Sequence, residues 1–223
     1  NESGIIDSCV TSGTIINGES EIGGLVGYND ESGTVLFCSA RCNISGDQGC
    51  LVGGLVGSNR GSILRSFANG TIKIKYGGLL WVPSGMSGVP SWSLGGLVGE
   101  HYGEIDQCGA IGLVGGAEIR TYIFSSEDVG GLVGYSEGYI SRSYSAAALT
   151  GYITRGGGFV GKNADVISQC LAMGPVTGYS YIGGFTGDDS GISDQCYAAG
   201  PVAAVGYDSG FSSYVNTPGE TIS

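Results

Sequence analysis

Hydrophobic and polar residues alternate along most of this chain, and the alternation recurs in a repeating unit. In each unit one face carries a cysteine or serine, then a small residue, then usually a glycine, then a branched apolar residue. The first of these columns reads Cys9, Cys38, Ser66, Cys108, Ser143, Cys170 and Cys196. A period of two is that of a β-strand with one buried face, so the columns predict a set of equivalent strands.

A second signature marks each unit. The anchor Gly-Gly-(Leu/Phe)-(Val/Thr)-Gly begins at Gly23, Gly53, Gly95, Gly130, Gly157 and Gly183, and a degraded copy begins at Ser209. Successive anchors are separated by 30, 42, 35, 27, 26 and 26 residues. The unit is therefore about 26 residues long, and the longer spacings indicate insertions at residues 75–94 and 115–128.

Such a unit fits one coil of three strands, each of five or six residues, joined by three tight turns. The coils begin near residues 4, 33, 61, 103, 138, 165 and 191. Stacked about 4.8 Å apart, seven coils give a rod about 30–35 Å long. We therefore predict an all-β fold, with residues 1–223 forming one parallel β-solenoid (β-helix). The glycines are expected at the corners, where positive φ is required, and their density excludes helices.

Composition supports a folded chain with no affinity for nucleic acid. The 223 residues include 45 glycines, and 41% are hydrophobic while 13% are charged, which is the opposite of a disordered chain. The net charge is -11, from 20 acidic and nine basic residues, so no basic stripe is available for phosphate or for an anionic membrane surface. The chain contains no run of about 18 apolar residues, so we expect no membrane-inserted helix.

The stretch from Val129 to Ile140, continuing to Ser145, resembles the GLUG repeat, named for its Gly-Leu-apolar-Gly core. That family occurs in bacterial surface proteins, including large adhesins and IgA-cleaving metallopeptidases outside their catalytic domains. The resemblance extends from Gly4 to about Phe211. It implies an extracellular or cell-surface stalk or adhesive segment, and it carries over no catalytic residue.

The seven cysteines leave two interpretations open. Stacking would place Cys9 beside Cys38 and Cys170 beside Cys196, within disulfide range, while Cys42 and Cys50 could bridge a corner of one coil. The alternative is a ladder of buried thiols that act as small hydrophobic side chains, since serine replaces cysteine in the same column.

Candidates for metal or acid–base chemistry are few. The single histidine, His101, falls in a column otherwise occupied by Asn29, Asn59, Ser136, Asn163 and Asp189, which predicts a polar corner ladder. The acidic pairs Asp30-Glu31 and Asp188-Asp189 lack the repeat of calcium-binding β-rolls and are expected to be solvated. The chain lacks the cysteine and histidine spacing that is typical of zinc sites. We expect no metal, no cofactor and no catalytic residue.

The two insertions hold the most distinctive aromatic residues. The first contains Trp81 and Trp92, and the second contains Tyr122 and Phe124. Both fall between the same two strands, so they would protrude from one side of the rod. Exposed aromatic rings can bind sugar rings or protein partners. The alternative is a self-packed cap with its tryptophans buried.

These patterns favour a non-enzymatic extracellular structural or adhesive segment. Asn1 to Gly4 match the interior of a repeat, so we expect a piece of a longer protein. Open strand edges predict contact with adjacent coils of that protein or with another copy, stacked head to tail into a filament. A glycan or a surface protein of a host or neighbouring cell is a further expected partner. The alternatives are a carbohydrate-binding module and a polysaccharide-acting β-helix enzyme.

Overall fold

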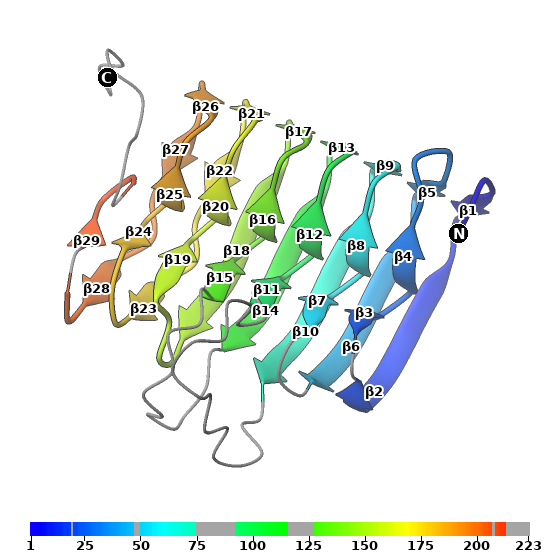
Figure 1. The fold of residues 1–223 in the computed structure, drawn as a ribbon, viewed down its shortest axis with the longest axis horizontal. Coiled ribbons are helices and arrows are strands. Elements are labelled where there is room, and N and C mark those ends of the chain that lie inside the picture. The colour runs from blue at the N-terminus through cyan, green and yellow to red at the C-terminus, as the bar shows by residue number, and fades with distance from the viewer. Residues whose placement is uncertain (19, 47–49, 75–91, 116–126, 207, 213–223) are drawn as a thin grey trace, which may run out of the picture.

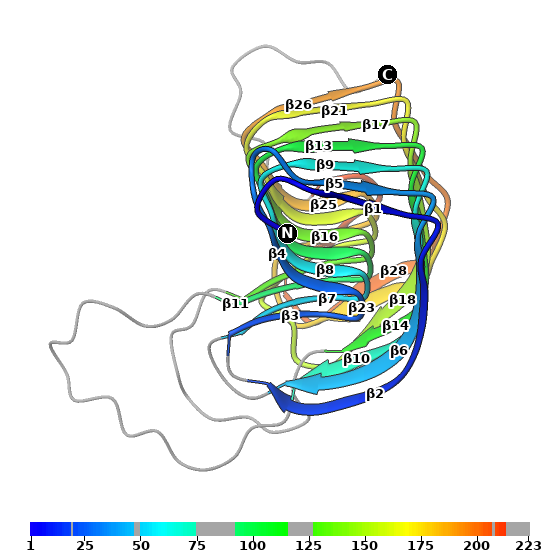
Figure 2. The same ribbon diagram turned by 90° about the vertical axis from the view of Figure 1, so that its right-hand side faces the viewer.

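The chain folds into a stack of parallel strands. The computed structural model describes residues 1–18, 20–46, 50–74, 92–115, 127–206 and 208–212, and these ranges contain strands but no helix. The strands form four sheets, named here A to D in the order in which each coil visits them (Figures 1 and 2). All pairings are parallel and link each coil to the next, so the predicted parallel β-solenoid is confirmed.

Each sheet takes one strand position from successive coils. Sheet A contains β1 (Ile5–Asp7), β5 (Thr34–Leu36), β9 (Ser62–Leu64), β13 (Glu104–Asp106), β17 (Tyr139–Ser141), β21 (Val166–Ser168) and β26 (Ile192–Asp194). Sheet B contains β2 (Val10–Gly18), β6 (Ser39–Gly46), β10 (Phe67–Ile74), β14 (Gly109–Gly115), β18 (Tyr144–Thr150), β22 (Leu171–Ala172), β23 (Val176–Gly178), β27 (Tyr197–Ala198) and β28 (Val202–Ala204).

The other two sheets are built from the anchors. Sheet C contains β3 (Glu21–Gly23), β7 (Leu51–Gly53), β11 (Trp92–Gly95), β15 (Glu127–Gly130), β19 (Arg155–Gly157), β24 (Ile182–Gly183) and β29 (Asp208–Ser209). Sheet D contains β4 (Val26–Asn29), β8 (Val56–Asn59), β12 (Val98–His101), β16 (Val133–Ser136), β20 (Val160–Asn163) and β25 (Thr186–Asp189).

A coil therefore has four strand positions, where three were expected. The difference arises inside the anchor. In the first coil β3 ends at Gly23 and β4 begins at Val26, so the chain turns between them. The hydrophobicity of this segment would by itself predict one strand, but the turn divides the segment between sheets C and D.

The corner between sheets A and B corrects the expectation that glycines serve the turns by adopting positive φ. This corner is occupied in every coil by a residue other than glycine in the left-handed region, with φ between 46° and 56°. These residues are Ser8, Phe37, Arg65, Gln107, Arg142, Gln169 and Gln195. The next residue in each coil is the cysteine or serine of the repeat, and the side chain of that residue holds the turn.

The anchor glycines serve close approach instead. A Cβ atom on Gly95, the first glycine of its anchor, would lie 1.8 Å from the carbonyl oxygen of Val98 within the same turn. On Gly96 it would lie 2.1 Å from the carbonyl oxygen of Gly131 in the next coil and 2.9 Å from Cβ of Ala110. None of these contacts can accommodate a methyl group, so the glycine requirement is steric.

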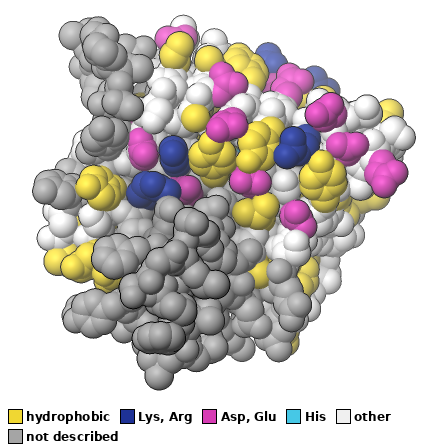
Figure 3. Space-filling view, viewed as in Figure 1, with side chains coloured by type: hydrophobic (Ala, Val, Ile, Leu, Met, Phe, Trp, Pro, Cys, Tyr) yellow, Lys and Arg dark blue, Asp and Glu magenta, His cyan; other side chains and the backbone are white. Residues whose placement is uncertain are grey.

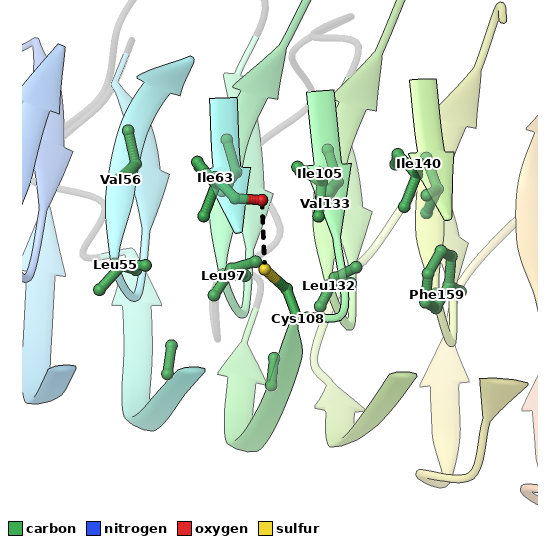
Figure 4. Close-up of a cluster of buried hydrophobic side chains, with 14 of the residues drawn as sticks. Leu55, Val56, Ile63, Leu97, Ile105, Cys108, Leu132, Val133, Ile140 and Phe159 are labelled. Atoms are coloured by element: carbon green, nitrogen blue, oxygen red, sulfur yellow. Dashed lines mark hydrogen bonds between the residues drawn. The ribbon is translucent and has the colours of Figure 1, made fainter. Parts of the chain in front are cut away.

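In most coils the second anchor glycine meets the small residue two places after the cysteine or serine, here called the alanine column, and this contact pinches the interior. The small residues in contact are Ala40, Ala68, Ala110, Ser145 and Ala198. Two hydrophobic clusters result. The first contains Val56, Ile63, Leu97 and their equivalents (Figure 4). The second contains Ile44, Val52, Leu149 and their equivalents. Each cluster continues through the coils, and burial of each leucine or isoleucine contributes about 1.5–3 kcal/mol.

The leucine column of the anchor becomes phenylalanine in the last coils. The Phe159 and Phe185 rings stack with centroids 4.8 Å apart, and Phe185 stacks on Phe211 at the same distance. Ser209 pairs with Gly183, so the degraded last anchor keeps its place in the ladder.

Candidate functional site

The aromatic residues predicted to bind a ligand do not form a described platform. Trp81, Tyr122 and Phe124 lie outside the described residues. Trp92 opens β11, is 6% exposed and packs in the second hydrophobic cluster. Residues 92–94 and 127–128, predicted as the ends of the insertions, belong to the sheet C strands β11 and β15.

The cysteine and serine column is a hydrogen-bonded ladder at the corner between sheets A and B. The backbone N–H of Cys38 donates to Oγ of Ser66 (3.0 Å), and that of Ser66 donates to Sγ of Cys108 (3.4 Å). The Cys108 N–H donates in turn to Oγ of Ser143 (3.0 Å). Serine and cysteine share this column because each offers a small acceptor to the coil before it.

Each side chain in this column also donates. The Cys108 thiol lies 3.3 Å from the carbonyl oxygen of Asp106 and 3.4 Å from that of Ile63 (Figure 4). Burial raises the pKa of Cys108 to about 12, so the side chain remains a thiol at neutral pH. The column therefore supplies the acceptor for one backbone N–H in each coil, while the N–H groups of the residues on either side keep carbonyl partners in adjacent coils.

The cysteines predicted to pair lie on neighbouring rungs at the two ends of this ladder. The Cys9 N–H donates to Sγ of Cys38 (3.4 Å). A hydrogen bond from Cys170 lowers the pKa of Cys196, and the same contact raises that of Cys170. These four cysteines are thiols in the structure. Their disulfides stay predictions.

The pair Cys42 and Cys50 occupies the second hydrophobic cluster. Cys42 lies in β6, and Cys50 directly precedes β7, and both are buried. The Cys42 thiol lies 3.6 Å from the carbonyl oxygen of Gly24. Their bridge across the corner of the coil also stays a prediction.

The column that contains His101 is a buried polar ladder at the end of sheet D. Asn29 Nδ2 donates to Oδ1 of Asn59 (2.7 Å), and Asn59 Nδ2 lies 3.1 Å from Nδ1 of His101. Further along, Asn163 Nδ2 donates to Oδ1 of Asp189 (2.8 Å). The side chains of Asn29, Asn59, His101 and Asn163 are completely buried. The predicted ladder is thus inside the coil, where amide pairing satisfies its asparagines, while Ser136 interrupts it by donating to the carbonyl oxygen of Gly138 (3.1 Å).

The neighbours of His101 fix its tautomer. Because the Asn59 amide nitrogen can only donate, Nδ1 of His101 accepts and carries no proton. Nε2 then donates to the carbonyl oxygen of Tyr139 (3.3 Å). Burial lowers the pKa of His101 to about 4. This neutral, fully enclosed imidazole is a structural member of the ladder.

The outer face of sheet D, with the corner that follows it, carries hydrophobic side chains among charged ones (Figure 3). Tyr28 is exposed there, and Tyr102 and Tyr135 are partly exposed. We call this surface the tyrosine strip. It consists of Tyr28, Asp30, Arg60, Glu100, Tyr102, Tyr135, Glu137, Lys162 and Asp188. Strand register places Tyr28, Ser58, Glu100, Tyr135, Lys162 and Asp188 in one column across the six strands. This strip was not predicted, although its column has a signal in the sequence, the position two residues after the anchor valine or threonine.

The remaining carboxylates of interest are paired with arginine or hydrogen-bonded within the fold. Asp106 is bound by Arg142 (2.5 Å), which lowers its pKa, and by Ser141 (2.7 Å). Asp128 is buried beside Arg155 (2.6 Å), and desolvation raises its pKa. Asp189 accepts from Ser193 (2.7 Å). In the part of the chain that is described, no group of three His, Cys, Asp or Glu side chains is arranged to hold a metal ion.

These features define the class of the molecule as a parallel β-solenoid with an acidic, tyrosine-bearing face. No family model, curated protein or solved structure matches the chain. Among the described residues there is no helix long and apolar enough to span a membrane.

Proposed function

We propose that the chain is a non-enzymatic structural and adhesive segment of an extracellular or cell-surface protein, in which the stacked coils act as a stiff spacer. The observation that carries the proposal is the continuity of its ladders. Backbone pairing links seven rungs in sheet A without interruption. Beside it run the cysteine and serine column and two hydrophobic clusters. The GLUG resemblance of the anchors supports the same role.

The end coils support a further part of this proposal, that other coils or a second copy stack head to tail on this chain. Ile6, Cys9 and Leu25 in the first coil are only partly buried against the first cluster. Cys196 and Phe211 are only partly buried in the last coil. Another coil placed on either end would continue these columns and cover the strand edges.

Electron microscopy and activity measurements on the purified chain test the proposal. We expect rods whose length grows with protein concentration, and no cleavage of polysaccharides. Leu25→Asp should shorten the rods by placing a charge on the end surface, while Tyr139→Ala on the side of the rod should leave them unchanged. Polysaccharide turnover that one acidic substitution abolishes would overturn the proposal in favour of a β-helix enzyme.

A further inference from the structure

The tyrosine strip holds its aromatic rings in fixed positions. The guanidinium carbon of Arg60 lies 4.8 Å from the centroid of the Tyr102 ring, and the Tyr102 and Tyr135 rings meet edge to face at 6.2 Å. The ammonium nitrogen of Lys162 lies 5.7 Å from the Tyr135 ring. Rings that are already ordered lose little side-chain entropy when they bind a ligand.

Carboxylates fix the hydroxyl ends of the same tyrosines. Tyr135 donates to Oε1 of Glu137, and Tyr28 donates to Oδ1 of Asp30 (3.3 Å). Burial, together with a hydrogen bond to Glu100, raises the pKa of Tyr102 to about 12. The strip thus presents partly exposed apolar rings bordered by strong hydrogen-bond acceptors, with Arg60 over one face of Tyr102 and Lys162 over one face of Tyr135.

We propose that the tyrosine strip binds a neutral polysaccharide chain lying along the solenoid axis, across the strands of sheet D. A sugar ring matches this surface because it offers an apolar C–H face and a rim of hydroxyl donors. Six strands spaced about 4.8 Å apart give a track about 24 Å long, enough for several sugar rings. This inference rests on the proposed adhesive function, and it adds to that function the class of ligand that is bound.

The charge of the strip decides between classes of glycan. Its carboxylates, on Asp30, Glu100, Glu137 and Asp188, outnumber its cations, on Arg60 and Lys162. The whole chain also carries a net charge of -11. An acidic polysaccharide would meet like charges along the track, and such contacts oppose binding. A neutral chain avoids this repulsion and can still donate hydroxyl hydrogens to the carboxylates.

Native affinity electrophoresis with soluble polysaccharides tests the inference. We expect at least one of β-glucan, galactomannan and dextran to retard the chain, and polygalacturonate to leave it unretarded. Tyr102→Ala and Tyr135→Ala should each weaken binding about tenfold, as expected for loss of a central aromatic contact. Tyr102→Phe should weaken it less, because the ring remains.

Tyr139→Ala is the matched control, because Tyr139 is an exposed tyrosine that lies in sheet A, outside the strip. It should bind as the unaltered chain does, and circular dichroism should show that all variants keep the fold. Equal binding by the Tyr102, Tyr135 and Tyr139 variants would overturn the inference. So would preference for polygalacturonate, or no retardation by any of the three neutral polysaccharides. Rod formation is independent of these outcomes and reports on the proposed structural role separately.

Discussion

The side-chain amide nitrogen of Asn59 lies 3.1 Å from Nδ1 of His101 and donates a hydrogen bond to it inside the solenoid. The same nitrogen donates to the carbonyl oxygen of Gly61 (2.9 Å), while Oδ1 of Asn59 accepts from Asn29. A proton added to Nδ1 of the histidine would therefore find no acceptor on Asn59, and this keeps the histidine neutral. This contact makes the stability of the fold dependent on pH.

We expect the free energy of unfolding to fall as the pH is lowered from about 6.5 to about 4. The pKa of His101 is about 4 in the folded chain and 6.5 without burial. Between these values the unfolded state binds the proton and the folded state does not, so stability rises with pH through this window and is complete above it. The full loss amounts to about 3 kcal/mol, measurable by urea unfolding at a series of pH values.

His101→Asn is the control for this dependence. Asparagine occupies the same column at Asn59 and Asn163, where it forms the ladder without a titrating group. The variant should lose most of the stability change between pH 6.5 and 4. A slope as steep as that of the unaltered chain would show that another group titrates.

The cysteine and serine column predicts that two substitutions of Cys108 differ in their cost to stability. Cys108→Ser keeps both an acceptor for the N–H of Ser66 and a donor to the carbonyl oxygen of Asp106, so it should change stability by less than about 1 kcal/mol. Cys108→Ala removes both and should cost about 1–3 kcal/mol. Urea unfolding midpoints would compare the two. Equal losses would show that only the volume of the side chain matters.

Reactivity toward alkylating agents should distinguish Cys196 from Cys108. Cys196 is partly exposed, and its pKa is lowered by the hydrogen bond from Cys170. Cys108 is buried, and its pKa is raised to about 12. Because the thiolate is the reactive form, iodoacetamide at pH 8 should modify Cys196 before Cys108 and leave Cys108 unmodified until the chain unfolds. Peptide mass spectrometry would measure the order, and early modification of Cys108 would contradict its enclosure.

Much of this fold can be predicted from residues that repeat. The period of two around Cys108 and Ala110 predicts the buried face of sheet B, and the anchor spacing predicts the coil. The left-handed corner at Gln107 escaped prediction because its column mixes serine, phenylalanine, arginine and glutamine, none of which marks positive φ as glycine does. The tyrosine strip escaped for a similar reason. Its members vary from coil to coil, and only the register brings Tyr135 beside Lys162.

The anchor glycines give the strongest prediction about stability. Gly96→Ala would place its Cβ 2.1 Å from the carbonyl oxygen of Gly131 and 2.9 Å from Cβ of Ala110, so adjacent coils would have to separate. We expect a loss of more than about 4 kcal/mol or failure to fold, since the clash is with backbone and not with a movable side chain.

Gly115→Ala is the matched control. Its Cβ would meet nothing closer than 3.6 Å, in ordinary van der Waals contact, and its φ lies outside the left-handed region. It should stay within about 1 kcal/mol of the unaltered chain in thermal or urea unfolding. If Gly96→Ala were tolerated as well as Gly115→Ala, the pinch between the anchor and the alanine column could not be what sets the cross-section of the coil.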